Sequence, residues 1–348
     1  MLVGLATALG VGVAGAQTGT TGAAQAAPAA KGAPAATPPL QLNSLDPTSK
    51  ADPFPPVNPK FFTAASPTAD TVNGFLKTIW GYDPNRIWRV EAIQTTAAPG
   101  VSKVVVYVSD RSPNAKVQSM GFFVTPDGKH AIADSSGVIS FGATPFADNR
   151  RLLQERADGA SRGAGTKDLL MVEFADMQCP HCKEAQGTIE QLVKDFPNAR
   201  VVFQSFPLVD VHPFAFKAAA YGYCVQKQKN DAFFPYAAAV FDAQAALTPE
   251  TGDQTLKNAV TKAGLDPVAI DACASTQAIK DQVNASIKLG EEVGVDQTPI
   301  LMVNGRPLPL AQVPYETLKT IVSFQAVTDG VHTGSPTSGS VNPPTLGK

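Results

Sequence analysis

Two of the four cysteines, Cys179 and Cys182, stand with only Pro180 and His181 between them. An apolar run at residues 169–174 precedes this motif and a helical pattern follows it. Cys179 is therefore expected at a helix N-terminus, where free N–H groups and the helix dipole favour a thiolate. Pro180 suits the first helical turn because its missing N–H is not needed there, and a protonated His181 would add a positive charge. A disulfide of such an acidic thiol is easily reduced and therefore oxidising, with Cys182 as the resolving thiol.

One carboxylate stands close to this motif in the sequence. Glu173 lies six residues before Cys179, inside an apolar run that is typical of a buried strand. A buried acid is costly unless it has a partner or a task, so Glu173 is a candidate proton acceptor for Cys182. In the alternative interpretation, Glu173 points to a solvated edge of the sheet.

The same Cys-x-x-Cys spacing could instead supply half of a structural zinc site. Such a site would need a second, nearby pair of cysteines or histidines. Cys224 and Cys273 do not form such a pair in the sequence. Three histidines are interpreted as having no part in the chemistry: His130, His212 and His332. No metal and no other cofactor is therefore expected.

The elements that must position the motif begin as a βαβ pattern. A strand at residues 169–174, a helix after the motif and a second apolar strand at residues 200–206 form this start. A long stretch with helical periodicity follows. A strand at residues 299–303, a turn at Asn304-Gly305 and a helix at residues 315–324 complete the domain.

A block with a different pattern precedes this domain. A helix is predicted at residues 68–80, and Thr125-Pro-Asp-Gly128 is predicted to be a hairpin turn between strands. The expected strands, rich in β-branched and aromatic residues, are residues 87–93, 103–109, 119–124 and 130–133. The block is predicted to be a small α+β domain at residues 61–145. A connecting helix and a glycine-containing linker are expected at residues 146–166.

Composition limits the class of protein. With 44% hydrophobic residues, the 348-residue chain can bury ordinary cores. The 28 Lys and Arg residues nearly balance 30 Asp and Glu residues, which gives a net charge of -2. No large basic surface is implied, so nucleic acid is not an expected partner.

Both ends of the chain are expected to lie outside the folded domains. Residues 2–16 are apolar or small and end in Ala14-Gly15-Ala16, which fits a secretory signal peptide, residues 1–16, cleaved after Ala16. As a helix of about 22 Å, this run is short for a permanent anchor in a hydrocarbon core of roughly 30 Å. Residues 17–60, rich in Ala and Pro, are expected to be a disordered linker, and residues 327–348 a disordered tail. The protein is therefore expected to be periplasmic or otherwise exported, where disulfides can form.

Two segments of the chain resemble one known family. The segment Phe174-Ala-Asp-Met-Gln-Cys-Pro-His-Cys-Lys183 resembles the active-site segment of the DsbA-like thiol:disulfide oxidoreductases, an exported branch of the thioredoxin superfamily. The segment Gly294-Val-Asp-Gln-Thr-Pro-Ile-Leu-Met-Val-Asn-Gly305 resembles the one that carries the family's cis-proline. The resemblance covers residues 167–326. It implies that Pro299 is the cis-proline, that Thr298 precedes it, and that both face the active-site sulfurs.

The resemblance also implies the fold class. We expect an α/β protein with a thioredoxin fold and a helical insertion at about residues 210–290, preceded by the small α+β domain. That first domain, with its hairpin at residues 121–130, resembles the N-terminal dimerisation domain of DsbC-like isomerases. Cys224 and Cys273 fall early and late in the insertion and could form a structural disulfide; the alternative is two independent buried thiols.

The expected function is an exported enzyme that introduces disulfides into exported proteins by thiol–disulfide exchange at Cys179 and Cys182. The Pro-His pair favours this oxidant. Thr298, where DsbA has valine, and the additional domain favour a DsbC-like isomerase instead. A chaperone or docking module with a secondary redox site is a further alternative. The expected partners are reduced or misfolded exported proteins, a membrane redox partner and, through the first domain, a second copy of the chain.

Overall fold

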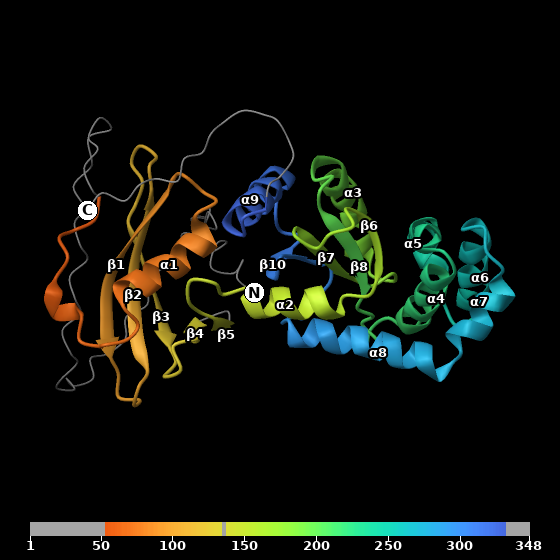
Figure 1. Cartoon of the computed structure of the whole chain (residues 1–348), viewed down its shortest axis with the longest axis horizontal. Helices are drawn as coiled ribbons and strands as arrows, with labels where there is room; N and C mark the ends of the chain where they lie inside the picture. The colour runs from red at the N-terminus through yellow and green to blue at the C-terminus, as the bar shows by residue number, and fades with distance from the viewer. Residues whose placement is uncertain (1–52, 134–136, 332–348) are drawn as a thin grey trace, which may run out of the picture.

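The computed structural model describes residues 53–133 and 137–331. The expected signal peptide, the expected linker up to residue 52 and the expected tail from residue 332 lie outside the described residues. Along the long axis, Figure 1 shows an N-terminal sheet, a second sheet with helices on both faces, and a group of helices at the far end. We call residues 53–146 the N-terminal domain and residues 147–331 the C-terminal domain. Among the described helices, none is long and apolar enough to cross a bilayer.

In the N-terminal domain, one helix covers a five-stranded antiparallel sheet. Helix α1 (Ala69–Trp80) follows the 3-10 helix η2 (Pro59–Phe61), and it begins where Thr68 Oγ1 accepts a hydrogen bond from the Thr71 N–H. The strands follow in chain order: β1 (Arg86–Thr95), β2 (Ser102–Asp110), β3 (Gln118–Val124), β4 (His130–Ala133) and β5 (Gly137–Ser140). The predicted helix and four predicted strands are present. Strand β5 was not predicted, because its sequence, Gly137-Val-Ile-Ser140, shows no alternation of apolar and polar residues.

The C-terminal domain is built on a second sheet, in the order β10-β9-β7-β8-β6. The central strand β7 (Leu170–Ala175) is buried at every position, as its apolar sequence predicts. It pairs in parallel with β8 (Arg200–Ser205) and antiparallel with β9 (Ile300–Val303). Strands β10 (Arg306–Pro309) and β6 (Ala160–Gly163) form the two antiparallel edges.

Helices cover both faces of this second sheet. On one face lie α3 (Pro180–Asp195) and α9 (Tyr315–Thr328); on the other lie α2 (Ala147–Arg156) and α8 (Gln277–Glu292). The C-terminal end of β7 therefore meets the N-terminal end of α3 between two packed layers. The cysteine motif lies at this junction.

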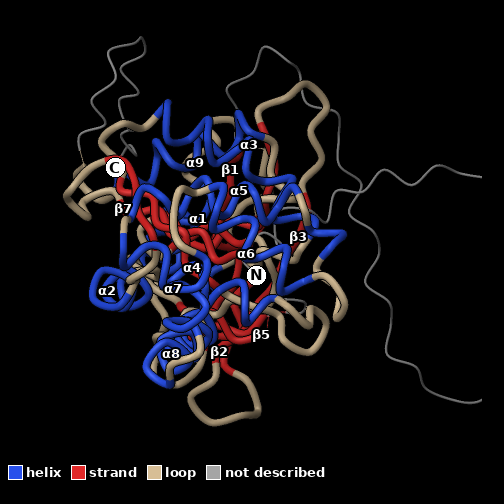
Figure 2. The backbone as a smooth tube through the Cα atoms, turned by 90° about the vertical axis from the view of Figure 1, so that its right-hand side faces the viewer, coloured by secondary structure: helices blue, strands red, loops and turns tan. Residues whose placement is uncertain are grey.

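The predicted helical insertion is confirmed. After β8 the chain forms α4 (Ala215–Gln228), α5 (Phe233–Asp242), α6 (Gly252–Lys262) and α7 (Pro267–Ala274), with short 3-10 turns η3 (Asn230–Ala232) and η4 (Gln244–Ala246) between them. These helices share one core with the cysteine motif and with β8, in which Tyr221 and Tyr236 are fully buried. Figure 2 views this end of the molecule, with the insertion helices in front of the strands.

The expected linker after α2 contains a strand instead. Residues 160–163 form β6, which pairs with β8 from Ala160 opposite Phe203 to Gly163 opposite Arg200. Sequence reasoning missed it because an edge strand of four small or polar residues shows neither alternation nor an apolar run. Gly159 is required for close packing, since a Cβ there would lie 1.9 Å from the Phe203 carbonyl oxygen. The C-terminal sheet therefore begins before residue 167.

Two other expected boundaries also differ. Residues 53–60, expected within the disordered linker, belong to the N-terminal domain. Phe54 stacks on Tyr107 with ring centroids 6.5 Å apart, and the Arg89 guanidinium lies over the Phe54 ring. A single aromatic side chain in a proline-rich stretch gives no periodic signal, so the sequence did not indicate this contact. At the other end, α9 continues to Thr328, past the expected domain end at residue 326.

Arg306 joins the two domains. Its buried guanidinium donates hydrogen bonds to the carbonyl oxygens of Thr78 (3.1 Å) and Ile79 (2.8 Å) in the last turn of α1. It also lies 5.3 Å from the ring centroid of Tyr82 and 5.6 Å from that of Phe146. Carbonyl groups at a helix C-terminus lack helical partners. A strand of the C-terminal domain therefore caps a helix of the N-terminal domain.

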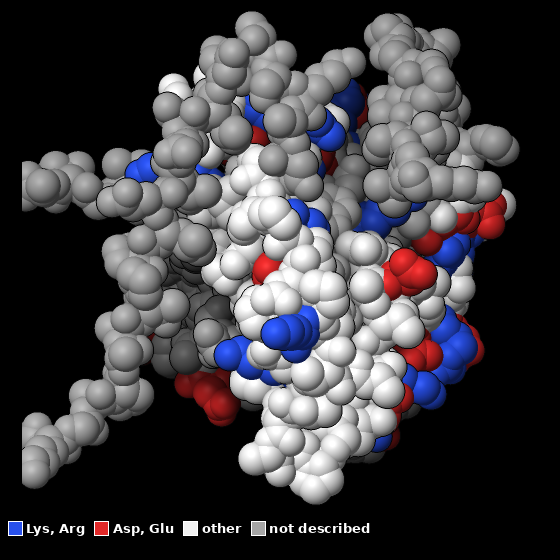
Figure 3. All heavy atoms as spheres, turned by 90° about the vertical axis from the view of Figure 1, so that its left-hand side faces the viewer, with Lys and Arg blue, Asp and Glu red and all other residues white. Residues whose placement is uncertain are grey.

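The N-terminal domain carries little charge on the end that it forms. Figure 3 shows the described part of that end as mostly uncharged, with scattered charged groups of both signs. The face of the first sheet opposite α1 bears a row of exposed apolar side chains, because Phe123 pairs with Ile132 and Ile132 pairs with Val138 across three strands. Cross-strand partners share a face, so these three side chains form one apolar row.

Candidate active site

The two cysteines of the motif lie where β7 ends and α3 begins. Cys179 is the N-cap residue of α3 and Pro180 is the first helical residue, so Sγ of Cys179 lies beside the free N–H groups of the first turn. Both cysteines are reduced, with 5% of Cys179 and none of Cys182 exposed to solvent. Cys179 is the more accessible of the two, although it is more enclosed than a helix-terminal position suggests.

The pKa values of the two thiols move in opposite directions. The pKa of Cys179 falls to about 5, chiefly because of a hydrogen bond from the Cys182 thiol. Burial opposes this fall, while a hydrogen bond with Thr298 and the N–H groups of Cys182 and His181 lower the pKa further. Burial and the neighbouring Cys179 sulfur raise the pKa of Cys182 well above that of an ordinary thiol. At neutral pH, Cys179 is therefore a thiolate and Cys182 a thiol.

The His181 ring contacts an acidic side chain of its own helix. The side chain is 66% exposed, and its Nδ1 lies 3.0 Å from a carboxylate oxygen of Glu184, three residues along α3. This carboxylate raises the pKa of His181. An exposed imidazole at this helical spacing is attracted to the neighbouring acid. The Cys179 sulfur also raises the pKa of His181, so a protonated ring places positive charge near the thiolate. The backbone N–H of His181 lowers the pKa of Cys179 as well.

The segment before β9 lies against the motif. The Thr298–Pro299 peptide bond is cis, and the Thr298 carbonyl oxygen lies 3.8 Å from Sγ of Cys179. Thr298 is 119 positions from Cys179 in the sequence. The fold thus brings Thr298 and Pro299 beside the more accessible sulfur.

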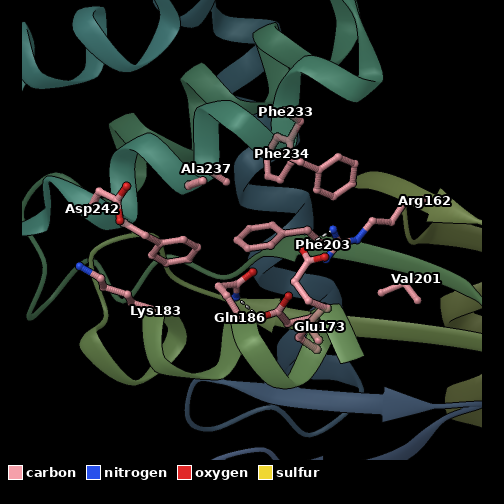
Figure 4. Close-up of a pocket in the computed structure, with 14 residues that line it drawn as sticks. Arg162, Glu173, Lys183, Gln186, Val201, Phe203, Phe233, Phe234, Ala237 and Asp242 are labelled. Carbon is pink, nitrogen blue, oxygen red and sulfur yellow. Dashed lines mark hydrogen bonds and ion pairs between the residues drawn. The ribbon is translucent and has the colours of Figure 1, made fainter. Parts of the chain in front are cut away.

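Glu173 lies in the buried strand beneath the motif, not at a solvated edge. Its Oε1 accepts a 2.8 Å hydrogen bond from Gln186 Nε2, which also lies 3.0 Å from the Cys182 carbonyl oxygen. Burial raises the pKa of Glu173 to about 7. Figure 4 shows its carboxyl group at the wall of a pocket of about 240 Å³ below Phe203 and Phe233. A carboxyl with this pKa can take up or release a proton at neutral pH.

Sequence reasoning missed the polar contacts that hold the loop between β7 and α3. Asp176 follows β7 and is buried; its Oδ1 accepts a hydrogen bond from the Gln178 N–H (2.7 Å), and its Oδ2 accepts from the Leu208 N–H (2.8 Å) and from His212 Nδ1 (2.7 Å). The N–H of Asp176 lies 3.4 Å from Sγ of Cys182. His212, which the sequence analysis gave no part in the chemistry, thus contacts a buried carboxylate beside the motif. No local pattern signals it, because its partner lies 36 positions away.

Two glutamines complete the support of this loop. Gln178 Oε1 accepts a 2.8 Å hydrogen bond from the Phe214 N–H. Gln244 Nε2 donates to the carbonyl oxygens of Met177 (2.9 Å) and Cys179 (3.0 Å). Phe214 and Gln244 belong to the insertion. The insertion therefore fixes the backbone that carries Cys179.

The remaining two cysteines lie in the insertion. A disulfide joins Cys224 on α4 to Cys273 on α7, with Cα atoms 6.0 Å apart. Among the described residues, no group of three or more His, Cys, Asp or Glu side chains could hold a metal ion.

Parts of this chain are similar in sequence to known proteins. The family model described as thioredoxin matches residues 158–323, which begins before β6. Over 169 residues, the chain is 24% identical to the probable disulfide bond formation protein D of Bacillus anthracis, covering 47% of this chain and 76% of that protein. Over 58 residues, it is 41% identical to the Na(+)/H(+) antiporter NhaA 1 of Salinispora arenicola, covering 17% of this chain and 9% of that protein. The chain thus spans less than a tenth of the length of the first antiporter relatives.

Two solved structures are similar to the chain at low identity. ScsC from Proteus mirabilis in a transitional conformation is 21% identical, with a TM-score of 0.45, and covers 52% of this chain and 78% of that one. Oxidised BdbD from Bacillus subtilis is 20% identical, with a TM-score of 0.43, and covers 48% of this chain and 92% of that one.

Proposed function

From a chain that carries a thioredoxin-like domain at residues 158–323, we propose an exported thiol–disulfide oxidoreductase that introduces disulfides into other exported proteins. One observation carries the proposal: the pKa of Cys179 falls to about 5 while that of Cys182 rises. A stabilised Cys179 thiolate favours the reduced enzyme, so the Cys179–Cys182 disulfide gives up its oxidising equivalents readily.

The proposed reaction is two exchanges at one sulfur. A substrate thiolate attacks Sγ of Cys179, the Cys179–Cys182 bond breaks, and its electron pair goes to Sγ of Cys182, which then takes up a proton. A second substrate thiolate attacks the substrate sulfur of the mixed disulfide and releases the Cys179 thiolate. The substrate thus loses two electrons and two protons; one proton goes to Cys182 and the other to solvent, and the reduced enzyme carries a Cys179 thiolate and a Cys182 thiol. Glu173, with its pKa of about 7, is the proposed proton donor and acceptor for Cys182.

Two neighbouring residues complete the proposed site. Thr298 and Pro299 flank Cys179 and are proposed to align the substrate chain beside its sulfur. The dithiol must be reoxidised for a second turnover, and we propose that a membrane redox partner does this. Export is supported by the apolar stretch at residues 2–16 and by the Cys224–Cys273 disulfide, since structural disulfides persist mainly outside the cytosol.

A second candidate function is disulfide isomerisation. The apolar row of Phe123, Ile132 and Val138 favours it, because an isomerase must hold a misfolded client and an exposed apolar row can bind one. The same row could pair two copies of the chain. An isomerase would act with Cys179 already reduced and would attack a wrong substrate disulfide.

The deciding experiment compares both activities in the full chain. As an oxidase, the protein should reoxidise a reduced secreted protein faster than it rescues a scrambled one, and its potential against glutathione should lie above about -270 mV, the value of thioredoxin. Ile132→Glu should leave this oxidation intact. Efficient rescue of scrambled substrate with slow oxidation, and loss of that rescue in Ile132→Glu, would establish the isomerase instead.

A further inference from the structure

The exchange chemistry proposed above makes no use of the Asp176–His212 pair. The pair lies directly behind Cys182: the Asp176 side chain is fully buried, and one fifth of the His212 side chain is exposed. The carboxylate accepts hydrogen bonds from Gln178, Leu208 and His212, while the Asp176 N–H points at Sγ of Cys182. One residue thus connects the insertion to the buried thiol.

The two oxygens of this carboxylate attach to different parts of the chain. Oδ1 accepts a hydrogen bond from the N–H of Gln178, inside the active-site loop. Oδ2 is bonded to Leu208 and His212, in the segment that leads from β8 into α4. His212 is the side-chain donor among these contacts, and a hydrogen bond between a buried carboxylate and an imidazole is strong. Removing His212 would therefore loosen Asp176 on the side that anchors it to the insertion.

The hydrogen bond from Asp176 to the sulfur has a definite effect on Cys182. Burial raises the pKa of Cys182, and the Asp176 N–H opposes this rise. Cys182 reacts only as a thiolate, and its pKa lies far above neutral pH. When the pKa of a thiol lies above the ambient pH, each further unit of pKa lowers its thiolate fraction tenfold. The reactivity of the thiolate itself rises by less, because the Brønsted slope is only about 0.4–0.5. A weaker hydrogen bond should therefore slow every step in which Cys182 carries charge.

We propose that His212 is a positioning residue that, through Asp176, aims a backbone N–H at Sγ of Cys182 and speeds the step in which Cys182 attacks Cys179. The proposal rests on the proposed thiol–disulfide exchange, because this step is the reverse of the first exchange proposed above. In that step Sγ of Cys182, as a thiolate, forms a bond with Sγ of Cys179. The bond between Cys179 and the substrate sulfur breaks, and the substrate leaves as a thiolate.

The test isolates this step with a glutathione mixed disulfide at Cys179. Its decay is followed by acid quench and mass spectrometry in the full chain. His212→Leu should slow the decay about fivefold, the effect of weakening one hydrogen bond to a developing charge. His212→Asn should remain close to the wild type because its amide nitrogen can occupy the position of Nδ1, whereas His212→Gln, with its donor one carbon further out, should be slow. If His212→Leu does not fold, the Asn and Gln variants make the comparison.

A matched control is present in the N-terminal domain. His130 Nδ1 lies 2.6 Å from a carboxylate oxygen of Asp127 on an exposed turn, so His130→Leu removes the same type of pair far from the motif in the sequence. In this variant the mixed disulfide at Cys179 should decay at the wild-type rate. The pH dependence of Cys179 alkylation should be unchanged in all His212 variants, since Asp176 is not among the groups that lower the pKa of Cys179.

Three outcomes are distinguishable. The positioning role is supported if the mixed disulfide decays slowly in His212→Gln and at the wild-type rate in His212→Asn, while the pH dependence of Cys179 alkylation is unchanged. Decay at the wild-type rate in both the Leu and Gln variants, or an equal slowing in Asn and Gln, overturns it. If the wild-type mixed disulfide itself does not decay through Cys182, the proposed exchange function fails, which is a separate result.

Discussion

Cys179 and Cys182 are the same residue type in one helical turn, yet their surroundings give them different charges. The largest cause of the acidity of Cys179 is the hydrogen bond from the Cys182 thiol. Alkylation of Cys179 by iodoacetamide should therefore rise with pH to half its maximum near pH 5, instead of near the ordinary thiol value of 9.0. Cys182→Ala should move this midpoint upward, and His181→Gln should move it little. Mass mapping of the modified cysteine at each pH provides the measurement; a midpoint above pH 8 in the wild type would contradict the assignment.

Glu173 makes a second prediction at this scale, about stability. Its folded-state pKa of about 7 exceeds the ordinary value of 4.5. The stability that its neutral form provides is present below pH 4.5 and is lost as pH rises through about 7, because the buried carboxyl must then ionise. Glu173→Gln should thus be more stable than the wild type at pH 8, by about 3 kcal/mol, and similar to it at pH 4.5. Urea unfolding at both pH values tests this, with exposed Glu155→Gln as the control; equal differences at both pH values would refute it.

Residues with a local signal could be predicted and residues with a distant partner could not. The Cys-Pro-His-Cys spacing and an acid within an apolar run indicated Cys179, Cys182 and Glu173 directly. Thr298 and Pro299 required the family resemblance, because no spacing connects them to the motif. Asp176 and His212 escaped both routes, since their contact depends on how the insertion returns to the sheet.

At the scale of elements, the Cys224–Cys273 disulfide fastens α4 to α7 across 49 positions of sequence. Closing a loop of this length contributes about 4 kcal/mol in the chain-entropy model. Replacing both cysteines with alanine should lower the free energy of unfolding by an amount of this order, measured in urea, and should leave the pH midpoint of Cys179 alkylation unchanged. If the pH midpoint of Cys179 alkylation shifted as the free energy of unfolding fell, the packing of α4 against α7 would instead set the acidity of Cys179.

Element type followed from periodicity wherever a segment was long enough to show one. The buried run of β7 and the apolar spacing of α1 were predicted closely. Strands β5 and β6 were missed, because backbone pairing to a neighbouring strand defines them more than their side chains do. Edge strands of this kind can be recognised only once their partner strand is known.

For the whole molecule, the contact at Arg306 decides whether two domains behave as one unit. The sequence predicted both domains but not their junction, since an arginine in a short strand carries no signal for a helix that lies more than 200 positions earlier. Burial lowers the pKa of Arg306 to about 10, so the guanidinium remains charged at neutral pH. It is held by carbonyl groups and aromatic rings, and both benefit from a cation.

This arrangement predicts how the domains separate. Arg306→Met keeps the bulk of the side chain but leaves two carbonyl groups of α1 without their donors, which should destabilise the docked N-terminal domain by about 2–4 kcal/mol. Arg306→Lys should recover only part of the loss, because an ammonium cannot reproduce the planar fork that reaches both carbonyls. Calorimetry should show one unfolding transition in the wild type and an earlier, separate one in Arg306→Met. Arg151→Met, which removes an exposed arginine paired with Glu155 on α2, serves as the control and should unfold like the wild type. A single unshifted transition in Arg306→Met would mean that the apolar contacts between the domains, not this cap, hold them together.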